Sequence, residues 1–149
     1  MIIKTKKVYY CEFCKKHSLL PLVEHEKHCT GNINRTCRMC AEETGGINLP
    51  EMVEKWKKIA EVARKIPKPD PTYVSSCSIS GEEQKEMEKL VNVKLVMDDA
   101  NGCPACSLAI ILLAKLAEYP IFIQFDFKKE KNDWWEQINA DRNEGECYY

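Results

Sequence analysis

Nine cysteines in a chain of 149 residues constrain this protein more than any other feature of its sequence. Six of them form three Cys-x-x-Cys pairs, namely Cys11/Cys14, Cys37/Cys40 and Cys103/Cys106. The first seven residues carry charge and are followed by no long apolar stretch, so we expect no signal peptide and a reducing, cytoplasmic setting. In that setting the spacing indicates metal or redox chemistry before structural disulfides. The odd number of cysteines also argues against a closed disulfide framework.

The first constellation joins Cys11 and Cys14 to His25 and Cys29. A Cys-x-x-Cys turn supplies two zinc ligands, and two residues one helical turn apart supply two more from one face. Over residues 8–29 this pattern resembles the zinc-finger superfamily in its Cys-Cys-His-Cys form. Ten residues separate Cys14 from His25, against about twelve in the common finger. Because Pro21 lies inside this loop, we expect the finger helix to start near residue 20.

The second constellation brings together two pairs that have no local partners, Cys37/Cys40 and Cys103/Cys106. Pro104 is typical of the first turn of a helix, so the second pair lies at a helix start, where the helix dipole favours thiolates. A treble-clef zinc site is built in this way, from one pair in a turn and one pair at a helix start. The sequence therefore predicts two Zn²⁺ ions per chain, each with four ligands.

The ligand assignment leaves alternatives open. His28 competes with His25 for the first site, and His28 with Cys29 can instead join Cys37 and Cys40. The single cysteines at positions 77 and 147 have no partner motif, and we expect them to be free.

Helical periodicity covers much of the remaining chain. Asn48 caps a helix that ends at Pro67, and this helix carries an apolar stripe of Leu49, Val53, Trp56, Ala60 and Ala63. A connector over 68–71 and an extended segment over 72–79 follow, and a capping box over 80–83 then opens a helix toward Asp99. The rival interpretation of 91–97 is a strand, because three valines are crowded there. We expect further helices over 104–118 and 128–142, with an extended segment over 121–127 between them.

The predicted fold class is mainly α with little β. We expect a small zinc-stabilised domain in which residues 1–46 form a zinc-binding module and residues 47–149 form a helical body. The body contributes Cys103 and Cys106 to a shared, treble-clef-like four-cysteine site. Residues 1–40 carry a net charge of +5 and residues 41–149 a net charge of −6. No apolar run approaches the roughly 20 residues of a membrane-spanning helix, so we expect no membrane association.

Two segments, residues 25–40 and residues 101–106, resemble small uncharacterised zinc proteins encoded by bacteriophages. This resemblance implies the cytoplasm of a host cell or a virion as the setting, and it implies no activity. We therefore expect a non-enzymatic structural or adaptor protein that acts through a protein partner or self-association, with no small-molecule substrate. The adjacent Trp134 and Trp135 cannot face the same way on a helix, so one of them is either exposed or covered by a partner.

Nucleic-acid binding is the first alternative function. The base-reading positions of the finger fall among Ser18, Pro21 and Glu24, and none offers Arg or Lys to guanine. Basic residues near the N-terminus can still contact phosphates without sequence specificity, namely Lys4, Lys6, Lys7, Lys15, Lys16, Arg35 and Arg38.

A thiol oxidoreductase using Cys103 and Cys106 is the second alternative. A strand over 91–97, the Cys-x-x-Cys pair, a helix and a strand over 121–127 resemble the start of thioredoxin-like proteins. Against it, no proline follows Pro120 to supply the cis-proline of that fold, and only 22 residues follow Phe127. A His-Asn-His nuclease is disfavoured as well, because zinc uses one or two of the three histidines.

Overall fold

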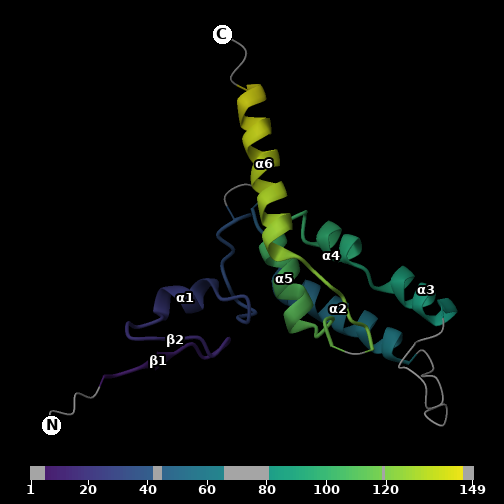
Figure 1. Cartoon of the computed structure of the whole chain (residues 1–149), viewed down its shortest axis with the longest axis horizontal. Coiled ribbons are helices and arrows are strands. Elements are labelled where there is room, and N and C mark those ends of the chain that lie inside the picture. Colours follow the sequence, from purple (N-terminus) through teal and green to yellow (C-terminus); the bar gives the residue numbers. More distant parts are fainter. Residues whose placement is uncertain (1–5, 42–44, 66–80, 119, 146–149) are drawn as a thin grey trace.

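The computed structural model describes residues 6–41, 45–65, 81–118 and 120–145. Within these ranges the chain is mainly helical, with one two-stranded hairpin, as the sequence predicts (Figure 1). Its elements are β1 (Tyr9–Tyr10), β2 (His17–Ser18), α1 (Val23–His28), α2 (Leu49–Arg64), α3 (Gly81–Leu90), α4 (Val93–Asp99), α5 (Pro104–Leu113) and α6 (Phe127–Gly145). None of the described helices combines the length and apolar character needed to cross a bilayer.

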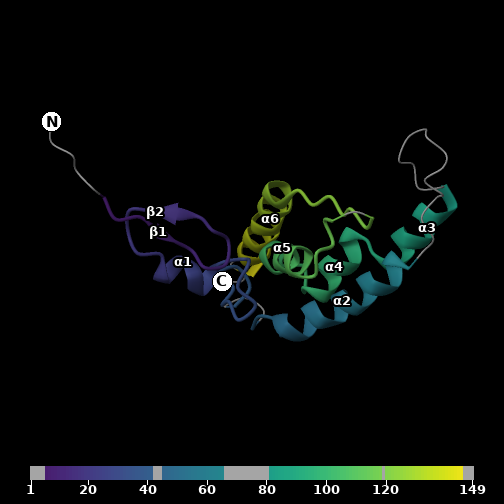
Figure 2. The same ribbon diagram turned by 90° about the horizontal axis from the view of Figure 1, so that it is seen from below.

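The N-terminal elements form a finger at one end of the molecule. Strands β1 and β2 are antiparallel, and both views place them beside α1, at the opposite end from α3 (Figures 1 and 2). Helix α1 begins at Val23 rather than near residue 20, so that prediction is wrong by about one turn. The backbone N–H of Leu20 instead donates to Ser18 Oγ at 3.0 Å. Pro21 also disfavours helical backbone angles at Leu20, the residue before it.

The hydrophobic core is built around α5, which packs against α2, α4 and α6. Its sequence is apolar on almost every side, as expected for a helix with neighbours all around it. From α2 comes the predicted stripe, and all five of its members are buried, Leu49, Val53, Trp56, Ala60 and Ala63. The Asn48 side chain accepts a hydrogen bond from the Glu51 N–H and caps α2, also as predicted.

The region before the last cysteine pair differs from both sequence interpretations. The predicted helix toward Asp99 is interrupted at residues 91 and 92, and the rival strand over 91–97 is wrong. The reason is Asn92, whose side-chain oxygen accepts from the Leu95 N–H at 3.0 Å and starts α4 as a separate helix. A cap therefore outweighs the β-propensity of the valines.

Helix α5 is shorter than predicted, since it ends at Leu113 rather than near Glu118. Lys115 has φ 58°, in the left-handed region that commonly ends helices. The N–H of Leu116 then bonds Ile111 O at 2.9 Å, and the Lys115 N–H bonds Leu112 O at 3.3 Å. These two bonds form a Schellman motif, and it turns Leu116 into the core.

Residues 121–126 do not form the predicted extended segment throughout, because Ile121 lies in a turn and Phe122 has φ 47°, in the left-handed region. The segment still follows the predicted alternation in burial, with half-buried Ile121, Ile123 and Phe125 between exposed residues. It pairs with no other strand in the described ranges. Helix α6 follows it and extends well beyond the other helices (Figure 1). The predictions for residues 66–80, together with Cys77 and Cys147, lie outside the described residues.

Candidate metal centres

The finger brings its four predicted ligands together. Cys11 and Cys14 lie at the turn after β1, His25 lies in α1, and Cys29 is the C-cap residue that follows α1. Their ligand atoms all lie within 4.8 Å of one another. Cys11 Sγ is 3.8 Å from Cys29 Sγ, and Cys14 Sγ is 3.1 Å from His25 Nε2.

The second cluster joins residues that are 66 apart in the sequence. Cys37 Sγ lies 3.7 Å from Cys103 Sγ, and Cys40 Sγ lies 3.5 Å from Cys106 Sγ. Cys37 and Cys40 bracket a turn, whereas Cys103 is the N-cap of α5 and Cys106 lies in its first turn. The predicted combination of one turn pair and one helix-start pair is therefore present.

The sulfur separations match a tetrahedral metal site. With Zn–S bonds of about 2.3 Å, the edge of a regular tetrahedron of sulfur atoms is about 3.8 Å. A disulfide would place the sulfur atoms about 2.0 Å apart, and none of the seven described cysteines forms one. A Cys₃His cluster and a Cys₄ cluster are thus compatible with two Zn²⁺ ions, as the sequence predicts.

Burial distinguishes the two clusters. All four cysteines of the second cluster are buried, Cys37, Cys40, Cys103 and Cys106. In the finger, Cys11 and Cys29 are buried, but Cys14 is exposed and His25 is half-buried. The second cluster is therefore part of the hydrophobic core, and one side of the first faces solvent.

Thiol electrostatics favour a bound cation in the second cluster. Hydrogen bonds from the side chains of Cys103 and Cys106 lower the pKa of Cys37 far below its ordinary range. Burial, and then the negative charge of Cys37, raises the pKa of Cys40. Hydrogen bonds to Cys103 and Cys37, followed by burial, raise the pKa of Cys106. The site concentrates negative charge on one sulfur, and four thiolates there need a divalent cation.

In the finger, burial and hydrogen bonding also shift the pKa values of the cysteine thiols. Burial raises the pKa of Cys11, but hydrogen bonding to the backbone of Cys14 and Phe13 outweighs this effect, so its pKa is lowered. Burial raises the pKa of Cys29 to about 11. A thiolate at Cys11 is thus prepared by the backbone, whereas one at Cys29 requires a neighbouring positive charge such as a metal ion.

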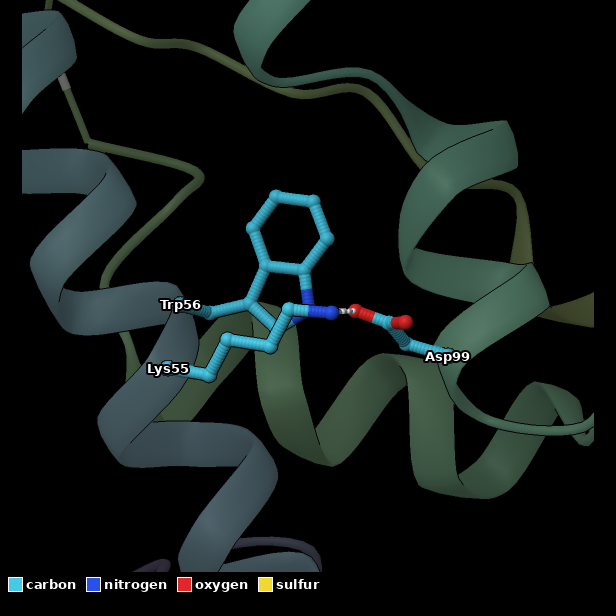
Figure 3. Close-up of polar contacts among 3 residues, drawn as sticks. All are labelled: Lys55, Trp56 and Asp99. Atoms are coloured by element: carbon cyan, nitrogen blue, oxygen red, sulfur yellow. Dashed lines mark hydrogen bonds and ion pairs between the residues drawn. The ribbon is translucent and has the colours of Figure 1, made fainter.

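Polar contacts hold the second cluster in place. Arg35 Nη1 donates to Ala105 O at 2.8 Å and links the segment before Cys37 to the first turn of α5. Helix α4 ends at Asp99, four residues before Cys103, and Asp99 Oδ2 accepts from Trp56 Nε1 at 2.9 Å and Lys55 Nζ at 2.6 Å (Figure 3). These contacts fix the start of α5 relative to α2.

His28 belongs to neither cluster. Its Nδ1 lies 2.7 Å from Thr36 O, and it is absent from both groups of four. The alternative site that combined His28 and Cys29 with Cys37 and Cys40 is therefore not formed. The Thr36 N–H also donates to Lys27 O at 2.9 Å, so α1 is tied directly to the segment that carries the second cluster.

A cavity of about 490 Å³ was not anticipated from the sequence. It lies between α3 and residues 120–124, and none of the eight cluster residues lines it. Its walls combine apolar and polar side chains, and they include Met87, Glu88, Val91, Phe122 and Ile123. Residues 91–93, at the break between α3 and α4, also line it, and periodicity did not predict that break.

Comparison of the chain with family models, curated proteins and solved structures finds no match.

Proposed function

We propose that this chain is a non-enzymatic zinc-binding structural protein that serves as an adaptor, through a protein partner or a second copy of itself. The observation that carries this proposal is the Cys₄ cluster. Its four cysteines are buried and come from two segments 66 residues apart. The Sγ atoms of Cys37 and Cys103 lie 3.7 Å apart, and those of Cys40 and Cys106 lie 3.5 Å apart. A closed set of four protein ligands is typical of structural zinc, whereas catalytic zinc keeps an open position.

The second zinc ion acts as a staple between distant parts of the chain. Closing a loop of about 60 residues costs only slightly more entropy than closing a short one. Zinc binding worth roughly 10 kcal/mol or more outweighs that cost. The ion therefore supplies stability that a core of modest size would otherwise lack.

The geometry offers little support for the thiol oxidoreductase alternative. Its strand–Cys-x-x-Cys–helix–strand order is not formed in the described ranges, because residues 93–99 are helical and residues 121–126 pair with no strand. Cys103 and Cys106 also face Cys37 and Cys40, so a metal ion would engage both sulfur atoms. We propose no enzymatic activity and no small-molecule substrate.

The adaptor role is supported by α6. This helix extends beyond the other helices (Figure 1). Its Trp135 side chain is 39% exposed and lies beside Trp134. Exposed tryptophans are common anchors of protein interfaces. The resemblance of two segments to phage-encoded zinc proteins further suggests a bacteriophage setting, with the protein in the host cytoplasm or the virion.

Native mass spectrometry tests the proposal, because it reads zinc content and oligomeric state together. We expect two Zn²⁺ ions per chain, and one ion in Cys37→Ser/Cys40→Ser. A stoichiometry of one in the unmodified protein would eliminate the shared site. A complex with a second copy would assign the partner, whereas a monomer would require a different protein.

A further inference from the structure

The exposed face of the finger hairpin carries two aromatic rings, those of Tyr10 and His17. Strands β1 and β2 pair Tyr9 with Ser18 and Tyr10 with His17. Because side chains alternate along a strand, half-buried Tyr9 and Ser18 occupy one face, and exposed Tyr10 and His17 occupy the other. Tyr10 is 65% exposed, and its ring centroid lies 6.1 Å from that of His17.

The apolar exposure extends around the hairpin. Six of the twelve large hydrophobic side chains that are exposed in the described ranges belong to the finger, Val8, Tyr10, Phe13, Leu19, Leu20 and Val23. Single exposed apolar residues are ordinary, but a group within one small module indicates an interaction surface.

Four lysines flank the residues of the hairpin in the sequence. Lys6, Lys7, Lys15 and Lys16 are all exposed, and Glu12 is the single acidic residue between positions 6 and 19. None of these four lysines forms an ion pair within the described residues. The Lys7 ammonium lies 5.2 Å from the centroid of the Tyr9 ring, on the other face of the same strand from Tyr10.

We propose that this face binds single-stranded nucleic acid, with the lysines contacting phosphates and the Tyr10 and His17 rings stacking on bases. The combination of a basic surface with exposed rings is the arrangement that binds single strands without sequence preference. The proposal rests on the finger zinc of the proposed function, because that ion fixes the hairpin.

Duplex DNA fits this surface poorly. Bases in a duplex are already stacked on one another and offer no free face to Tyr10. Helix α1 has six residues, and its first turn carries Val23 and Glu24 rather than a base-reading Arg or Lys. An acidic protein would neutralise the lysines, but it supplies few planar surfaces for the paired rings. It is the competing outcome of the test.

Fluorescence anisotropy with the zinc-loaded full chain tests the inference. The probes are labelled 12-nucleotide (dT) and (U) strands, a 12-base-pair duplex and a 12-residue polyglutamate. We expect saturable binding of single strands, weaker binding of the duplex, and a loss of about 50-fold in affinity between 50 and 200 mM salt if four lysines contact phosphate. A preference for (U) would assign RNA, a preference for (dT) would assign DNA, and equal affinities would show recognition without the 2′-hydroxyl.

Matched variants separate stacking from charge. Tyr10→Ala should weaken single-strand binding by at least about fivefold, whereas Trp135→Ala, an exposed aromatic residue of the body, should not. Lys7→Gln/Lys16→Gln should roughly halve the salt dependence, whereas Lys58→Gln/Lys94→Gln should leave it unchanged.

Zinc content measured on the same samples distinguishes the two proposals. Protein that holds two zinc ions but binds no single strand overturns this inference alone. Equal affinity for the duplex, or polyglutamate binding that matches single-strand binding and is insensitive to Tyr10→Ala, overturns it as well. Absence of zinc from the unmodified protein would instead count against the proposed function.

Discussion

At the scale of single residues, the two clusters differ in how far solvent reaches their sulfur atoms. Cys14 is exposed, whereas Cys40 and Cys103 are fully buried. An electrophile must reach a sulfur atom before it can displace zinc, so access controls which ligand reacts first. The finger is therefore expected to be the labile site.

We predict that N-ethylmaleimide modifies Cys14 before any cysteine of the second cluster and releases the finger zinc first. Peptide mass spectrometry over time identifies the modified cysteine, and native mass spectrometry follows the zinc. The background is Cys77→Ser/Cys147→Ser, which removes the two cysteines outside both clusters. Equal rates at Cys14 and Cys40 would show that burial does not protect the second site.

We also predict that the protein has no thiol–disulfide exchange activity. Cys103 and Cys106 lie opposite Cys37 and Cys40, and thiolates held by zinc are poor nucleophiles. Insulin reduction in the presence of dithiothreitol should equal the rate without protein. A thioredoxin-like rate that disappears in Cys103→Ser would refute the non-enzymatic assignment.

The residues of both clusters could be predicted from the sequence because each ligand pair has a short spacing that places its two side chains close together. A Cys-x-x-Cys turn and a His-x₃-Cys helical step each determine where two ligand atoms lie. The combination of Cys37/Cys40 with Cys103/Cys106 followed from the absence of nearer partners. The role of His28 did not follow, since its Nδ1 contact to Thr36 O depends on tertiary structure.

At the scale of elements, Asp99 connects α2 to the end of α4 (Figure 3). One carboxylate oxygen accepts from both the Trp56 indole and the Lys55 ammonium. Trp56 is 2% exposed, so its buried N–H relies on this carboxylate for its hydrogen bond. Lys55 is half-exposed, and solvent screens its ion pair.

We predict that Asp99→Ala lowers the free energy of unfolding by about 1–3 kcal/mol, because a buried indole N–H is left unsatisfied. The control Lys55→Met should cost less than about 1 kcal/mol. Urea unfolding of the zinc-loaded proteins, followed by circular dichroism, measures both values. Equal losses in the two variants would show that the ion pair, rather than the indole bond, makes the connection.

Element boundaries were harder to predict than the elements themselves. The α2 stripe was predicted in full because Leu49, Val53 and their neighbours follow one helical period. The break at Asn92 and the end of α5 at Lys115 depend on a side-chain cap and a left-handed residue. Hydrophobic periodicity reports neither feature, because one is a side-chain hydrogen bond to the backbone and the other is a backbone conformation.

At the scale of the whole molecule, the second cluster joins the segment after the finger to the start of α5. Cys37 and Cys40 belong to the same core as α2 and α5, and the Arg35 bond to Ala105 O lies beside them. The division into a zinc module over residues 1–46 and a helical body over residues 47–149 remains a prediction. The two parts should unfold separately only if the cluster between them does not hold zinc.

The last prediction separates a global staple from a local finger. Cys106→Ser removes one ligand of the shared site, so α5 and residues 33–41 should both lose amide protection, although they are far apart in sequence. Cys14→Ser should reduce protection chiefly within residues 8–29, because the finger ion closes only a local loop. Hydrogen exchange read by mass spectrometry compares the two variants with the unmodified protein. If Cys106→Ser leaves residues 33–41 as protected as before, the shared zinc site is wrong, and the finger is attached to an independent helical body.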